Sequence, residues 1–436
     1  MLSMPGAGSR RIGSSEVAAT VGFTLLYLLF SLQQVVIGRG LGEGISLGST
    51  SLRVIGLGAA IALLATRGIP VRLRRPLIAI VACLGVLAIS TALSDHRLIA
   101  LKFGVRYATQ LLMLWCILNL LVAFPHLRGP LGRATVVALW GSLAIGLGSR
   151  WGVEWFAQLG LLFHAPDALR YMPRIIGLYE HPATFGAIAV VVAVMATQLR
   201  EEAAIGIPTL AAAYVGMAAV LLSTEARNPA VPLLILAAAF AVTRGGRLRQ
   251  IALLALALLV ALVAVTIWRR YDELTSASRE SLATMFSLGR TYIWEGAADA
   301  WLGRPWWGLG PGVFQFLTPD FTGGRFLRGE LHAHNLVLAI LSETGLMGLA
   351  AMSGLVAALV APAWRGDAPA ASRQWALIWL VVVLGLGLFD FYLPFHGFSL
   401  HISLAAATVF TSISSKTTLT GAAPAATPVS ASGQVP

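Results

Sequence analysis

Residues 331–348 read LHAHNLVLAILSETGLMG, and within this stretch the longest polar segment of the chain gives way to an apolar run. The run begins after Asn335 and continues to about residue 361, which exceeds the ~20 residues that a helix needs to cross a bilayer. Glycine adopts non-helical backbone conformations at low cost. We therefore predict a short half-helix after Asn335, a break near Thr344-Gly345, and then a membrane-spanning helix.

Apolar runs of this kind recur along the whole chain of 436 residues. Hydrophobic residues make up 57% of it and charged residues only 11%, whereas a soluble domain carries about 25% charged residues. We predict an all-α fold, a polytopic transmembrane bundle of about 12 spans. The predicted spans are 17–37, 46–66, 76–93, 103–124, 133–149, 177–199, 204–223, 228–243, 248–268, 335–361, 374–395 and 397–414.

The distribution of basic residues predicts the orientation of these spans. Loops that face the cytoplasm carry an excess of Lys and Arg. With the N-terminus inside, the cytoplasmic segments hold fifteen of these residues and the short outer loops hold four. Both termini are therefore predicted to be cytoplasmic.

The same pattern divides the chain into four parts. Nine spans occupy residues 1–268, a large periplasmic loop of short helices occupies 269–333, and three spans occupy 334–414. The tail, residues 415–436, is rich in Ala, Thr, Ser and Pro, which predicts disorder. The large loop holds seven arginines, which indicates an anionic partner: Arg269, Arg270, Arg279, Arg290, Arg304, Arg325 and Arg328.

The net charge of +12 does not indicate nucleic acid in a chain of this kind. Arginines in a membrane protein more often report topology, or contact with the anionic headgroups and phosphates of a lipid bilayer. Cys83 and Cys116 both lie inside apolar runs, so we predict no structural disulfide.

The large loop contains a predicted helix and a glycine-rich turn. Residues 290–301 have apolar side chains at helical spacing, and Arg290 stands at the start of this helix. Glycines alternate over residues 308–312, but no strand–turn–helix unit surrounds them, so they are not a dinucleotide-binding fingerprint. Two interpretations remain open for them: a tight structural turn, or backbone amides that hold a phosphate.

Arg227 lies in a very short outer turn. It precedes Asn228 and Pro229, which suit the start of a helix, and the free amides of a helix N-terminus favour anions. Arg227 is therefore a candidate for binding phosphate, and an ion pair with Glu225 is the structural alternative.

Two further residues are candidates for the outer face. His181, followed by Pro182, opens the sixth span, where it either caps the helix or contacts substrate. Arg106 lies inside a predicted span near its outer end. An arginine within the membrane is a functional-site candidate, and the alternative is that its side chain extends to the membrane–water interface.

His332 and His334 lie two residues apart at the end of the loop. Two histidines can begin a metal site, but no nearby cysteine or carboxylate cluster completes one, so we predict no metal. His332 precedes the helix, so the two rings need not face the same way. At a helix start, the positive helix end and nearby arginines should lower the pKa of His334 and keep its ring neutral.

Taken together, these features resemble the region shared by O-antigen ligases and O-antigen polymerases. The resemblance covers residues 290–348 and consists of Arg290, Pro305, the glycine run, Phe314, His334-Asn335 and, nine residues later, Gly-x-x-Gly. Arg227 matches an essential arginine in a short loop of the family. Glu225 and Asn228 depart from the small-residue pattern that the family has there.

The resemblance implies a glycosyl transfer at the periplasmic face of the bacterial inner membrane. The donor would be a glycan on undecaprenyl diphosphate and the acceptor lipid A–core, with inversion at the anomeric carbon and no metal or other cofactor. His334 would be the base, and Arg290 and Arg227 would clamp the diphosphate. The residues expected to contact substrate are His332, Arg325, Arg328, Arg304, His181 and Arg106.

Two alternatives stay open at this stage. A polymerase of O-antigen or exopolysaccharide, or a protein O-oligosaccharyltransferase, would share the motif and differ in acceptor. A transporter of lipid-linked glycans would spread polar residues through the middle of several spans, whereas here they gather at one face.

Overall fold

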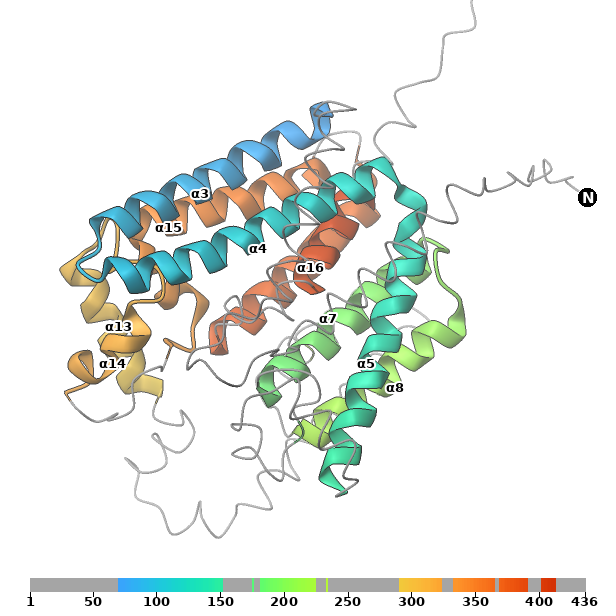
Figure 1. Ribbon diagram of the computed structural model, residues 1–436. Helices are drawn as coiled ribbons and strands as arrows, with labels where there is room; N and C mark the ends of the chain where they lie inside the picture. Colours follow the sequence, from blue (N-terminus) through green and yellow to red (C-terminus); the bar gives the residue numbers. More distant parts are fainter. Residues whose placement is uncertain are drawn as a thin grey trace, which may run out of the picture.

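A computed structural model describes residues 70–151, 175, 181–224, 233, 290–323, 332–364, 368–390 and 401–412 (Figure 1). Every regular element in these ranges is a helix, which confirms the all-α fold class. The predicted spans 17–37, 46–66 and 248–268, all of 228–243 except residue 233, and the tail lie outside the described residues.

Seven helical segments in the described ranges are long and apolar enough to cross a membrane. They are Val71–Leu93 (η1 Val71–Leu73 and α3 Arg74–Leu93), Arg97–Ala123 (α4), Pro125–Arg150 (η2 Pro125–Leu127 and α5 Arg128–Arg150), Pro182–Glu201 (α7), Ile207–Thr224 (α8), Leu336–Trp364 (α15 Leu336–Val360 and η4 Ala361–Trp364) and Ala370–Leu388 (in α16 Ala370–Phe389). A shorter apolar helix covers His401–Ser412. These helices fall on eight of the predicted spans, and the protein is a multi-pass membrane protein. The total of twelve spans stays a prediction.

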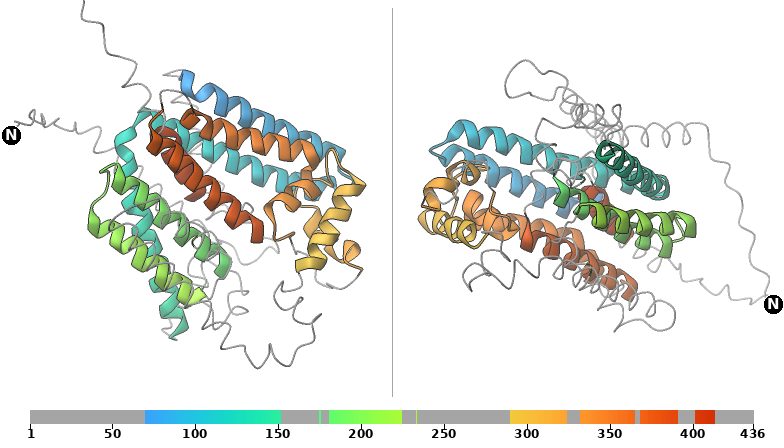
Figure 2. Two further views of the ribbon diagram at one scale, coloured as in Figure 1. Left: turned by 180° about the vertical axis from the view of Figure 1, so that it is seen from behind. Right: turned by 90° about the horizontal axis from the view of Figure 1, so that it is seen from below.

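The helices pack in two groups that α16 connects. Helices α3, α4 and α15 lie side by side, while α5, α7 and α8 form the second group, and α16 contacts both α15 and α7 (Figures 1 and 2). Helix α7 is the most deeply buried of the seven membrane-spanning candidates, because 94% of the residues in its most apolar stretch are buried. Residues 187–196 are mostly Ala and Val, and small side chains such as Ala allow neighbouring helices to approach closely; α7 contacts α5, α8 and α16.

The large loop contributes two short helices, α13 (Arg290–Gly303) and α14 (Phe314–Phe321), as its sequence predicts. The glycine run between them docks against α15 through backbone hydrogen bonds. The N–H of Leu309 donates to the carbonyl of Ser342 and that of Gly310 to the carbonyl of Glu343, both at 2.9 Å. The N–H of Gly312 donates to the Glu343 carboxylate at 2.8 Å. The structural-turn interpretation is confirmed, since these amides serve acceptors within the protein.

The predicted break in α15 is also confirmed. Gly345 has φ 67° and ψ −164°, a conformation open to glycine at little cost. A Cβ atom on Gly345 would lie 2.3 Å from the backbone of Trp306, and one on Gly308 would lie 2.4 Å from the backbone of Glu343. The turn and the break in α15 therefore fit together only because both carry glycine.

Each end of the bundle gathers segments that the sequence assigns to the same side. At the end that contains His334, called the histidine end, Ser94 Oγ donates to the carbonyl of Leu309 at 2.6 Å. At the opposite end, Arg128 pairs with Glu202 at 2.8 Å, and Trp375 Nε1 donates to Glu201 at 2.9 Å. Which compartment each end faces stays a prediction.

Candidate active site

His334 lies two residues before Leu336, the first residue of α15, and so stands near a helix start as the sequence predicts. Asn335 caps the helix, because its side-chain oxygen accepts from the N–H of Val337 at 3.0 Å and of Leu338 at 3.1 Å. Its side-chain nitrogen donates to the carbonyl of Leu388 at 3.1 Å, which ties the start of α15 to the end of α16.

The backbone of His334 is itself unusual, with φ 47°. This left-handed region is uncommon for residues other than glycine and costs about 1–3 kcal/mol where it is held in place. The contacts of Asn335 on one side and of the His334 ring on the other hold the residue there. Such strain is concentrated at functional sites.

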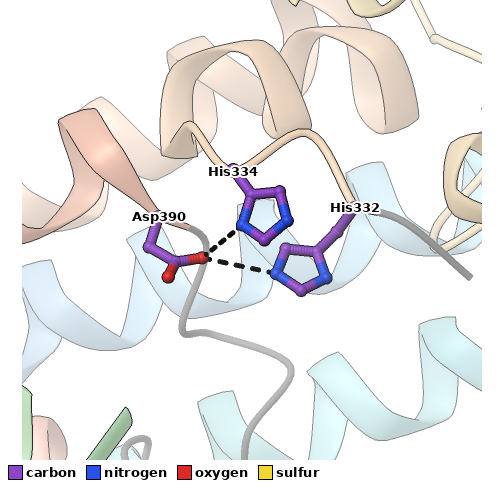
Figure 3. Close-up of side chains that lie close together, drawn as sticks. All are labelled: His332, His334 and Asp390. Carbon is purple, nitrogen blue, oxygen red and sulfur yellow. Dashed lines mark hydrogen bonds and ion pairs between the residues drawn. The ribbon is translucent and has the colours of Figure 1, made fainter. Parts of the chain in front are cut away.

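The ring of His334 contacts a carboxylate from a distant part of the chain (Figure 3). Nδ1 of His334 lies 3.0 Å from Oδ1 of Asp390, and Nε2 of His332 lies 3.3 Å from the same oxygen. Asp390 directly follows α16 and is only 2% exposed. The two imidazole rings lie with their centroids 4.3 Å apart. Both rings therefore face the same carboxylate oxygen. The sequence alone had allowed them to face different directions.

The carboxylate determines which nitrogen of His334 carries the hydrogen. Burial alone would raise the pKa of Asp390, but the hydrogen bonds from His332 and His334 outweigh it and hold that pKa well below its usual range. An ionised carboxylate only accepts hydrogen bonds, so Nδ1 of His334 is the donor. The lone pair of the neutral ring is then on Nε2. This nitrogen can accept a proton, as a general base must.

The pKa of His334 is lowered, as the sequence predicts, but the main causes differ from the predicted ones, which were the helix end and nearby arginines. The largest cause is burial of the ring, followed by the nearby His332, while the charge of Arg290 adds a smaller effect. Contact with Asp390 acts in the opposite direction without cancelling them. The ring is therefore neutral at pH 7, the state that a proton acceptor requires.

Arg290 is the first residue of α13, and its charge acts on His334 across the histidine end. Arg290 and His334, two of the three residues to which the resemblance gives catalytic roles, thus interact electrostatically. The third, Arg227, and the candidates Arg325 and Arg328 lie outside the described residues. Arg304 forms an ion pair with Asp95 and donates to the carbonyl of Leu93 at 3.4 Å, contacts that join the turn after α13 to the end of α3.

Residues 212–353 match the family model described as O-antigen ligase. The matched range contains the histidine stretch, α13, α14 and Arg227, and so confirms the resemblance found in the sequence. A match of this kind indicates a glycosyltransferase of the ligase or polymerase type, acting in a membrane on lipid-linked glycans. No curated protein matches the chain.

The remaining two candidates lie outside the range that matches the O-antigen ligase family. His181 caps α7, since its Nδ1 accepts from the N–H of Ala183 at 3.1 Å, and Pro182 occupies the first turn. The capping interpretation is thus confirmed. The Arg106 guanidinium lies 6.0 Å from the centre of the Phe103 ring, within α4. Whether either residue also contacts substrate stays a prediction.

Asp390 is the site residue that sequence reasoning missed, and it too lies beyond the O-antigen ligase match. A signal was present, because Asp390 is an acid inside the predicted apolar span 374–395, and such residues are functional-site candidates. The sequence also left His332 and His334 without a carboxylate to complete a metal site. The fold supplies that carboxylate, so this reason for excluding a metal was wrong. The group can hold a metal ion.

Proposed function

We propose that the protein is a glycosyltransferase that moves a glycan from undecaprenyl diphosphate to lipid A–core at the periplasmic face of the bacterial inner membrane. The single observation that carries the proposal is the contact between His334 and Asp390. It leaves a neutral imidazole with its lone pair on Nε2, within the chain segment that matches the O-antigen ligase family.

In the proposed reaction, Nε2 of His334 removes the proton from a hydroxyl of the acceptor sugar. The hydroxyl oxygen forms a bond to the anomeric carbon of the donor glycan as the bond from that carbon to the diphosphate oxygen breaks. The configuration at the anomeric carbon inverts, because one displacement occurs. Undecaprenyl diphosphate leaves with the electron pair and the extra negative charge.

The departing charge needs a cationic partner. Arginine presents a planar fork of donors that suits phosphate oxygens, and we assign this role to Arg290 and Arg227. Arg290 is supported by its effect on His334, since its positive charge is one of the causes that lower the pKa of that ring. With arginines supplying the charge, the transfer needs no metal ion.

The lipid part of a substrate needs an apolar surface. A cavity of about 230 Å³ extends along α3, α4, α15 and α16, and its wall is almost wholly apolar. The polar residues that line it include Tyr107, Gln110, Glu343, Thr344 and Ser403. Ile340 and Glu343 belong to the part of α15 that follows His334, so a prenyl chain held there would contact the helix that begins just after the proposed base.

The decisive experiment compares a deletion strain with its parent. If the protein is the ligase, the strain accumulates lipopolysaccharide with unmodified core together with long glycan on the carrier lipid. Single-repeat glycan instead would identify a polymerase, and normal lipopolysaccharide with glycosylation lost from a protein would identify a protein O-oligosaccharyltransferase. Carrier-linked glycan trapped on the cytoplasmic side would indicate a transporter.

A further inference from the structure

The histidine end brings three metal-ligating atoms together (Figure 3). Nε2 of His332, Nδ1 of His334 and Oδ1 of Asp390 all lie within 4.8 Å of one another. The two nitrogens lie 3.3 and 3.0 Å from the oxygen. Ligand atoms around a tetrahedral zinc ion, each about 2.0–2.2 Å from the metal, are about 3.3 Å apart. The two separations from Asp390 are therefore close to the spacing that such an ion requires.

We propose that His332, His334 and Asp390 bind a divalent transition-metal ion, Zn²⁺ by ligand preference, and that the bound ion switches the transferase off. Two imidazoles and one carboxylate suit Zn²⁺, whereas Mg²⁺ prefers oxygen ligands in an octahedral shell. Metal binding does not depend on the proposed function. The inhibitory effect does rest on the proposed function.

Inhibition follows from the tautomer of His334. An ion at Nδ1 uses the lone pair of that nitrogen, so the single hydrogen of the neutral ring must move from Nδ1 to Nε2. Nε2 then has no lone pair with which to accept a proton from the acceptor hydroxyl. Coordination and catalysis therefore exclude each other on this ring, and no net proton is gained or lost by it.

The same ion also removes the two contacts that orient the rings. Oδ1 of Asp390 would face the metal in place of the N–H of His334, and His332 would shift its own hydrogen from Nε2 to Nδ1. Asp390 is 2% exposed and the His334 side chain 18% exposed, so water competes poorly with these ligands once an ion is bound. Release of the ion returns both histidines to the hydrogen-bonded state.

A cobalt titration of the purified full-length chain, with any affinity tag removed, tests the binding site. Tetrahedral Co²⁺ absorbs visibly, so the wild type should show one Co²⁺ per chain that Zn²⁺ displaces. His332→Ala and Asp390→Asn should each weaken binding by ~100-fold or more, because loss even of a group that only orients a ligand costs about 10–100-fold. His126→Ala removes an exposed histidine in η2 at the opposite end and should leave the titration unchanged. Unaltered cobalt absorption in both His332→Ala and Asp390→Asn would refute the proposed metal site.

The inhibitory effect is measured in a transfer assay with purified donor and acceptor. Zn²⁺ should inhibit the wild type, EDTA should reverse this, and Mg²⁺ should have no effect. His332→Ala should need at least ~10-fold more Zn²⁺ for half-inhibition, relative to its own metal-free rate. A wild-type rate abolished by EDTA and restored by Zn²⁺ would overturn the inhibitory role. Absence of any transfer by the wild type would refute the proposed function, while the cobalt titration would still decide the metal site.

Discussion

Nδ1 of His334 lies 3.0 Å from Oδ1 of Asp390, although 56 residues separate them in the sequence. One residue precedes α15 and the other follows α16, so the contact joins the start of one helix to the end of another. It also fixes the nitrogen that can accept a proton.

His334→Ala should lower the rate of transfer on the order of 10²–10⁴-fold, the usual contribution of a general base. Binding of the carrier-linked donor should remain, because the arginine clamp is intact. The measurement is a purified-component assay with donor binding determined separately, and His126→Ala serves as the control. Turnover retained by His334→Ala, or donor binding lost as badly as in Arg290→Ala, would show that His334 is not the base.

Asp390→Asn should lower kcat by ~10²-fold or more while the KM for the donor changes little. The amide nitrogen can donate to Nδ1 of His334, which favours the tautomer with hydrogen on Nε2 and removes the base. Asp390→Glu should recover part of the activity, since it restores an acceptor. A purely structural role predicts a different result, namely less folded protein with an unchanged kcat for each folded molecule.

Arg290→Ala and Arg227→Ala should each reduce transfer by ~10²–10³-fold at normal protein levels. Arg290→Lys should also be poor, because a point charge does not reproduce a bidentate fork. Arg133→Ala, on the exposed surface near the opposite end, is the matched control for loss of one positive charge. Full activity in both Arg290→Ala and Arg227→Ala would shift the diphosphate site towards Arg325 and Arg328.

Gly308→Ala and Gly345→Ala should destabilise the protein by at least ~1–3 kcal/mol, because both positions have positive φ and no room for a Cβ atom. Gly303→Ala is the control, since nothing lies within 4 Å of a Cβ atom there. The midpoint of thermal unfolding in detergent is the readout. An unchanged midpoint for Gly345→Ala would argue against the break in α15.

Reporter fusions test the orientation. Fusions at Arg72, Arg247 and Arg365 should report the cytoplasm, and fusions at Asp95 and Gly323 the periplasm, because of the excess of basic residues on one side. The structure places Asp95 at the histidine end through its ion pair with Arg304. A cytoplasmic signal at Gly323 would put the proposed site on the wrong side of the membrane and refute the mechanism.

The sequence predicted the helices well because their signals are local. The apolar runs, Asn335 as a cap, Gly345 as a break and the glycine turn over 308–312 each depend on neighbouring residues, and each was found. The contact of Asp390 with the two histidines depends instead on how α16 packs beside α15. No spacing of residues in the sequence encodes that packing. The cause of the lowered pKa of His334 was missed for the same reason, since burial and the approach of His332 arise only from the fold.

The break at Gly345 separates the first part of α15 from the part that spans the bilayer. Residues 342 and 343 are bound by backbone hydrogen bonds to the glycine turn, and the carbonyl of Glu343 also accepts from Ser90 Oγ at 3.1 Å. Membrane helices adjust their tilt to the thickness of the surrounding lipid. Beyond the break, the N–H groups of Leu346 and Met347 donate to the carbonyls of Pro305 and Trp306 at 2.8 and 3.2 Å, so the same loop holds α15 on both sides of Gly345. A change in the tilt of α15 would therefore move this loop with it, and the histidine end would respond to the thickness of the bilayer.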